Sequence, residues 1–109
     1  MKDIERTSPN SARAVRAYTV EPGELANKIE EAVGTLPHWK FGHKEGHEVG
    51  LVRESRLFKF EDDVTVSISD NGAGCEAIFE SASRVGQGDL GQNPRNLRDL
   101  IEAVDRSLV

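Results

Sequence analysis

The sequence predicts an α+β domain, in which a curved antiparallel sheet of about five strands carries two helices on one face. Short segments of alternating apolar and polar residues, separated by turn residues, are typical of strands that hairpins link. Two longer segments, residues 21–36 and 93–108, instead repeat apolar residues at helical spacing. The expected order is strand, helix, four strands, helix.

The strands are expected over residues 13–20, 39–43, 48–54, 63–69 and 75–84. The clearest is 63–69, where Val64, Val66 and Ile68 alternate with hydroxyl side chains. Glycine-containing turns follow 39–43 and 63–69, and they indicate two hairpins.

The first helix is expected to open at Pro22, because proline suits the first helical turn, and to end near Gly34. Its apolar stripe comprises Leu25, Ile29, Ala32, Val33 and Leu36. Asn93 is the expected N-cap of the last helix, with Pro94 at the first helical position. The buried stripe of that helix comprises Leu97, Leu100, Ile101, Val104 and Leu108.

The chain has 109 residues, a length that fits one domain. We expect an extended N-terminal arm over residues 1–12 and a single domain over 13–109. Cys75 is the only cysteine, so neither an intrachain disulfide nor a thiolate metal cluster is expected. No apolar run approaches the roughly 18 residues that a membrane span needs, and we expect a soluble, cytoplasmic protein.

The charge of the chain bears on its partners. The formal net charge is −5, which argues against nucleic-acid binding and against an anionic membrane surface. Residues 1–20 carry four basic and two acidic side chains, so the remainder is more acidic than the whole.

A glycine-rich connector precedes the last helix and contains the string Gly86-x-Gly88-x-x-Gly91. A dinucleotide site needs such a string inside a strand–helix–strand unit, and here no strand follows the helix. Asp89 would also repel a pyrophosphate. We therefore expect no nucleotide and no other cofactor, and assign the glycines to a tight connector.

Polar residues around this connector form the first candidate site: Ser81, Ser83, Arg84, Asp89 and Asn93. One interpretation is a structural clamp, in which Arg84 and Asp89 form a bidentate pair that holds the connector on the sheet. The other is a binding site, in which Arg84 and the serines bind an anionic ligand. The sequence leaves both open.

A second candidate is a metal site made by Asp62, Asp63 and Asp89, since carboxylate oxygens suit hard cations. Adjacent strand residues point to opposite faces, so at most one of Asp62 and Asp63 is expected to join Asp89. His38, His43 and His47 complete no recognised zinc spacing.

With these residues in view, the chain resembles the uncharacterised family known as domain of unknown function 1499, from Thr7 to about Val104. The resemblance is carried by Ser8-Pro9-Asn10, Leu36 to Lys40, Phe60 to Val64, Ser81 to Gly86, and Asp89-Leu90-Gly91 with Asn93. Where the family often has a cysteine after the asparagine of its N-terminal motif, this chain has Ser11. The resemblance implies domain boundaries and candidate residues but no activity.

We expect a non-enzymatic module that binds a small or anionic ligand, or a protein partner, through the open sheet face or the connector. The alternative is a metal-assisted or acid–base hydrolase that uses Asp62 or Asp63 with Asp89. A single-layer sheet also exposes a face and two edges, which allows a homodimer through the sheet.

Overall fold

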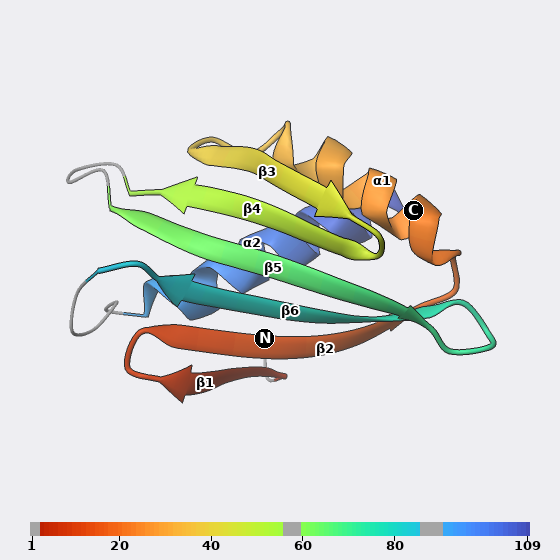
Figure 1. Ribbon diagram of the computed structural model, residues 1–109, viewed down its shortest axis with the longest axis horizontal. Helices are drawn as coiled ribbons and strands as arrows, with labels where there is room; N and C mark the ends of the chain where they lie inside the picture. The colour runs from red at the N-terminus through yellow and green to blue at the C-terminus, as the bar shows by residue number, and fades with distance from the viewer. Residues whose placement is uncertain (1–2, 56–59, 86–90) are drawn as a thin grey trace.

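The computed structural model describes residues 3–55, 60–85 and 91–109, and it contains one open sheet with two helices behind it (Figure 1). The elements in chain order are β1 (Ile4–Ser8), β2 (Ser11–Tyr18), α1 (Pro22–Val33), β3 (Trp39–Glu45), β4 (Glu48–Glu54), β5 (Glu61–Asp70), β6 (Cys75–Ser83) and α2 (Gln92–Ser107). The six strands lie in the order β1-β2-β6-β5-β4-β3, and every neighbouring pair is antiparallel. The α+β class and the two helices on one face are confirmed.

The sixth strand, β1, was not among the five predicted strands, because the sequence predicted residues 1–12 only as an extended arm. β1 pairs with β2, with Ile4 opposite Ala14 and a register shift between Arg6 and Ser8. Ile4 is its single apolar residue, which is too few for a periodic signal in the sequence. The strand forms because the edge of β2 supplies backbone partners, and an ion pair between Asp3 and Arg16 lies beside it.

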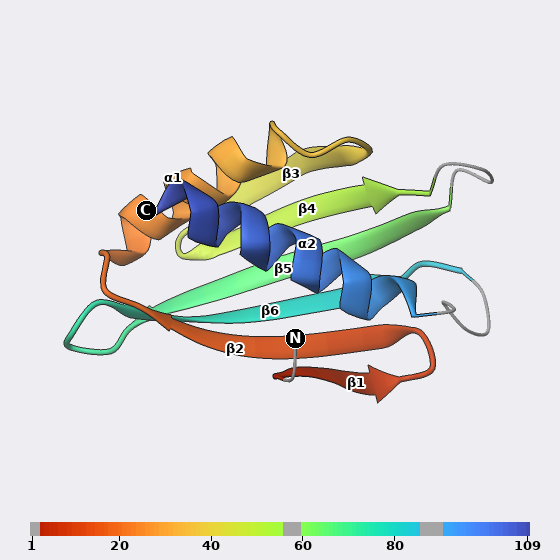
Figure 2. The ribbon, with the colours of Figure 1, turned by 180° about the vertical axis from the view of Figure 1, so that it is seen from behind.

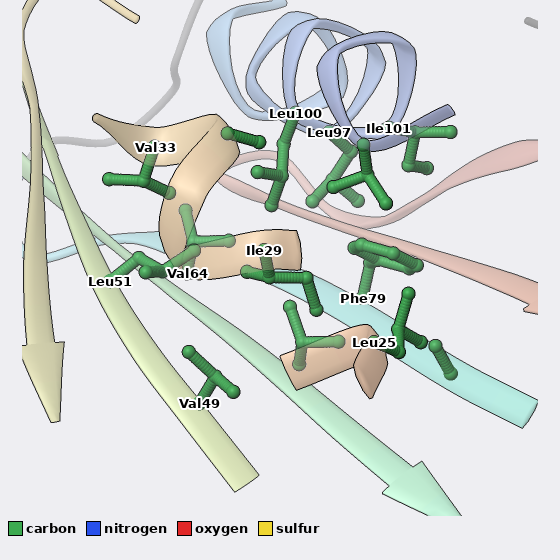
Figure 3. Close-up of a cluster of buried hydrophobic side chains, with 14 of the residues drawn as sticks. Leu25, Ile29, Val33, Val49, Leu51, Val64, Phe79, Leu97, Leu100 and Ile101 are labelled. Carbon is green, nitrogen blue, oxygen red and sulfur yellow. The ribbon is translucent and has the colours of Figure 1, made fainter. Parts of the chain in front are cut away.

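Both helices lie against the same face of the sheet, as the view from behind shows (Figure 2). Strand residues alternate between this covered face and the other, open face, which fits the period of a half-buried sheet. The core lies between the helices and the covered face (Figure 3). Its fully buried members include Leu25 and Ile29 from α1, Leu97, Leu100 and Ile101 from α2, and Val49, Val64 and Phe79 from the strands.

The ends of the helices agree with the sequence in one case and differ in the other. α1 begins at Pro22 and ends with Gly34 as its C-cap, as predicted. The predicted N-cap of α2 was wrong: Gly91 occupies that position with φ 82°, and Asn93 lies inside the helix with a buried side chain. Glycine adopts this left-handed conformation without steric cost. The Asn93 side chain does not cap the helix, because it forms hydrogen bonds with Ser81, Ser83 and Asn10 in the interior.

The far end of α2 is held to β2 by polar contacts. The Tyr18 hydroxyl donates to Asp105 at 3.1 Å, and Arg16 contacts the same carboxylate at 3.5 Å. Burial, reinforced by the Asp105 charge, raises the pKa of the Tyr18 hydroxyl. These contacts fix the direction in which α2 crosses the sheet.

Candidate functional site

Described residues from several of the segments that carry the family resemblance lie at one end of the sheet, which we call the polar end. It is the end where β1 turns into β2, β5 begins, β6 finishes and α2 starts (Figure 1). On the covered face its hydrogen bonds join the side chains of Asp62, Ser81, Ser83, Asn93 and Asn96 with the backbone carbonyl of Asn10. Of the residues that the sequence singled out, Asp62, Ser81, Ser83 and Asn93 therefore lie together.

Asn93 is the centre of this arrangement and is fully buried. Its Oδ1 accepts a hydrogen bond from the Ser81 hydroxyl at 2.6 Å. Its Nδ2 donates to the Asn10 carbonyl and to Ser83 Oγ, each at 2.9 Å. One side chain near the start of α2 thus holds β6 and the β1–β2 turn, which satisfies polar groups that would otherwise be costly to bury.

Asn96 is the second buried amide, one helical turn further on, and sequence reasoning missed it. Its Nδ2 donates to Asp62 Oδ2 at 2.8 Å and to Ser81 Oγ at 3.2 Å, while its Oδ1 accepts from Gln92 Nε2 at 2.6 Å. The available signal was its spacing of three from Asn93, which places both amides on one side of α2.

Asp62 is buried with 6% of its surface exposed, and Ser81 with 1%. Among the described residues, no buried side-chain nitrogen or oxygen lacks a hydrogen-bond partner. The polar end is therefore internally satisfied on its covered side. Such a network rigidifies the elements that it joins, here α2, β5 and β6.

Arg84 lies on the opposite, open side of the polar end. Its Nε and Nη2 donate to the two carboxylate oxygens of Asp63 at 3.0 and 2.8 Å, and its Nη1 donates to Glu61 at 2.6 Å. The hydrogen bonds from Arg84 lower the pKa of the Asp63 carboxyl. Asp89, the predicted partner of Arg84, lies outside the described residues, so the structure says nothing of that pair.

The metal-site residues do not meet within the described part of the chain. Asp62 faces α2 and bonds to Asn96, whereas Asp63 faces the open side and bonds to Arg84. Across residues 3–55, 60–85 and 91–109, no three His, Cys, Asp or Glu side chains form a group that could hold a metal ion. Asp89 and the first two glycines of the connector string lie outside these ranges, and Gly91 serves as the N-cap of α2.

The open face is the surface of the sheet that the helices leave uncovered. Its described charged residues are eight carboxylates (Glu5, Glu45, Glu48, Glu54, Glu61, Asp63, Glu76 and Glu80) against three arginine or lysine side chains (Arg13, Lys40 and Arg84). Near its middle, Val15 on β2 is opposite Ile78 on β6, and Val15 is 38% exposed. The face is thus acidic with a small apolar centre.

His43 lies on the same face near the β3 edge. Its ring lies over Gly50, where an added Cβ would clash with the imidazole. Its Nε2 is 3.6 Å from the Glu48 carboxylate. Because Gly50 has no side chain, the His43 ring on β3 can lie directly against the backbone of β4.

A shallow groove of about 530 Å³ lies on the covered side, between the last turns of the two helices. It is lined by Glu31, Ala32, Thr35, Leu36, Ala103, Arg106 and Ser107. The Thr35 and Ser107 hydroxyls already donate to carbonyls of their own helices.

Within the described residues, neither helix is long and apolar enough to cross a membrane.

The fold and the polar end together define a small α+β domain whose open sheet face is uncovered. The model of the family described as protein of unknown function (DUF1499) matches residues 2–104, and the chain belongs to this family. No curated protein has a matching sequence.

Solved structures of low sequence identity share the fold. Protein MLL2253 from Mesorhizobium loti aligns with a TM-score of 0.63 at 12% identity, over 90% of this chain and 96% of that one. A protein from Rhodobacter sphaeroides gives 0.57 at 13%, over 96% and 93%. Protein CV1439 from Chromobacterium violaceum gives 0.54 at 8%, over 88% and 95%. At these identities the likeness concerns the fold alone.

Proposed function

We propose that this chain is a non-enzymatic interaction module that binds a basic protein partner through its open sheet face. The observation that carries the proposal is the composition of that face, with eight carboxylates against three permanent cations around the apolar pair Val15 and Ile78. An apolar centre with a charged surround is the usual anatomy of a protein interface. The sign of the charge selects the partner, because complementary potentials steer association and exclude like-charged surfaces.

The arrangement at the polar end supports the open face over the connector as the binding surface. An anionic ligand at Arg84 would have to compete with Asp63 and Glu61, which already accept three hydrogen bonds from the guanidinium. The serines on the covered side are occupied by the two buried amides. These contacts favour a structural role for Arg84, Ser81 and Ser83.

The same charge distribution favours a different protein over a second copy of this chain. Stacking two open faces would place carboxylates of one copy against those of the other, which is costly at low ionic strength. The homodimer that the sequence allows would therefore need a sheet edge rather than the face.

The test uses two charge-reversal variants with the same change in net charge. Glu76→Lys with Glu80→Lys alters the centre of the open face, and Glu31→Lys with Glu102→Lys alters exposed positions on the helices. Proteins of the native cell that bind the wild-type chain are first purified. Each is then titrated with the wild type, the open-face variant and the helix variant in turn.

The proposal predicts that at least one purified partner binds the wild type and the helix variant with the same Kd. Its Kd for the open-face variant is expected to be higher by about 100-fold or more, because charges at the centre of the interface are reversed. Two results contradict it. Either no purified protein binds the wild type, or both variants bind their partner equally well.

A further inference from the structure

The hairpin tip between β5 and β6 holds an arrangement that the proposed function does not use. It comprises Asp70, Asn71, Gly72 and Ala73, all of which are exposed. Asn71 is the one asparagine of the sequence that glycine follows. An added Cβ at Gly72 would meet nothing within 4 Å, so the backbone beyond Asn71 is open to approach.

Two hydrogen bonds orient the Asn71 side chain and the backbone nitrogen that follows it. Asn71 Oδ1 accepts from the Ala73 N–H at 3.0 Å, which folds the carboxamide back along the chain. The Gly72 N–H donates to Asp70 Oδ1 at 2.7 Å. The carboxamide is thus folded toward the backbone of the turn, and the proton of the intervening Gly72 nitrogen already points at a carboxylate.

We propose that Asn71 is a site of spontaneous deamidation that this hairpin promotes. The Gly72 nitrogen attacks Asn71 Cγ while Asp70 accepts the nitrogen's proton as general base. The Ala73 N–H stabilises the negative charge that develops on Oδ1, as an oxyanion-hole donor does. The new bond joins Gly72 N to Asn71 Cγ. The Cγ–Nδ2 bond then breaks, ammonia leaves with the proton that Asp70 held, and a cyclic imide remains.

Water opens the imide at either of its two carbonyls, giving aspartate or iso-aspartate at position 71. Either product adds a negative charge beside Asp70, and iso-aspartate also adds one carbon to the backbone of the turn. Asp70 and Cys75 form the last residue pair of β5 and β6. The new charge at position 71 therefore lies in the turn that joins these two strands. The proposal is independent of the partner proposed above.

The experiment follows the mass of one tryptic peptide during incubation of the folded protein at neutral pH. The peptide from Phe60 to Arg84 contains Asn71 as its only asparagine and has no glutamine. A gain of about one dalton in this peptide therefore reports Asn71 alone. The same protein unfolded in urea provides the rate for the segment without the hairpin geometry.

Two variants test the roles within the hairpin. Asp70→Ser keeps a side-chain oxygen as acceptor but removes the base, and Asp99→Ser removes an exposed carboxylate on α2 as the matched control. We expect the folded wild type and Asp99→Ser to deamidate faster than the unfolded chain. We expect Asp70→Ser to be at least about 100-fold slower than the folded wild type, the lower end of what a positioned general base typically contributes.

The proposal is overturned if folding slows the reaction of Asn71, because the hairpin then protects the side chain instead of activating it. It is also overturned if Asp70→Ser reacts at the wild-type rate, because the carboxylate then takes no part. Thermal melts of both variants confirm that they are folded during incubation.

Discussion

Replacing Asn93 by alanine is expected to be among the most damaging single truncations of a polar side chain in this domain. The change removes three hydrogen bonds of 2.6 to 2.9 Å and leaves the buried Ser81 hydroxyl without the Asn93 acceptor. At about 1 kcal/mol for each buried neutral hydrogen bond, the free energy of unfolding falls by about 3 kcal/mol. For a chain of this length each kcal/mol lowers the melting midpoint by about 4–8 °C, so the expected fall is about 12–24 °C.

Thermal unfolding followed by circular dichroism measures this effect, with Asn27→Ala as the control. Asn27 also lies in a helix but is exposed, and its side chain accepts a hydrogen bond from Lys44 Nζ at 3.1 Å. Both substitutions replace a helical asparagine by alanine, but only Asn93→Ala removes side-chain contacts of the buried network. The control is expected to change stability by no more than about 0.5 kcal/mol.

A double-mutant cycle with Ser81→Ala tests whether the two side chains act together. Their contact at 2.6 Å predicts a coupling energy of about 0.5–3 kcal/mol. The reasoning is refuted if Asn93→Ala melts like Asn27→Ala, or if the Ser81 and Asn93 effects simply add. Either result would mean that the polar end does not anchor α2.

Three further predictions follow from the surface of the domain. Arg84→Gln is expected to lower stability at neutral pH, because Arg84 lowers the pKa of Asp63 below its usual value of 3.8 and so stabilises the fold above that pH. The difference in melting midpoint between Arg84→Gln and the wild type should vanish as the pH falls below the lowered pKa and Asp63 is protonated. A difference in melting midpoint that stays constant down to the lowest pH would contradict this prediction. Magnesium, manganese and calcium are each expected to leave the melting midpoint unchanged, since Asp62 and Asp63 face opposite sides of the sheet, and a saturable rise would instead favour the hydrolase alternative. Light scattering at low salt is expected to give the monomer mass, because the open faces repel one another, and a dimer that dissociates when salt is added would be inconsistent with this.

Much of the fold could be predicted because its signals are local and periodic. The strand over residues 48–54 matches β4 (Glu48–Glu54) at both ends, and the bounds of α1 follow from Pro22 and Gly34. The strand β1 could not be predicted, because its formation depends on the edge of β2 and not on its own sequence pattern.

Most residues of the candidate site could be predicted from the sequence, but their hydrogen-bond partners could not. Alternation along the strand placed Asp62 and Asp63 on opposite faces from the sequence alone. The partners of Arg84 were not predictable, because they depend on the register between β5 and β6, which places Arg84 beside Glu61 and Asp63. Asn96 was missed because the prediction of the helix followed its apolar stripe, and the spacing of three that puts Asn96 beside Asn93 lies outside that stripe.

The central claim is that the polar end holds the fold together while the open face binds the partner. The most direct measurement is a map of backbone amide chemical shifts as the purified partner is added to the isotopically labelled protein. The account predicts changes around Val15 and Ile78 on the open face, with Asn93 and Asn96 unaffected. Changes concentrated at Asn93 and Asn96, with Val15 and Ile78 unaffected, would contradict it.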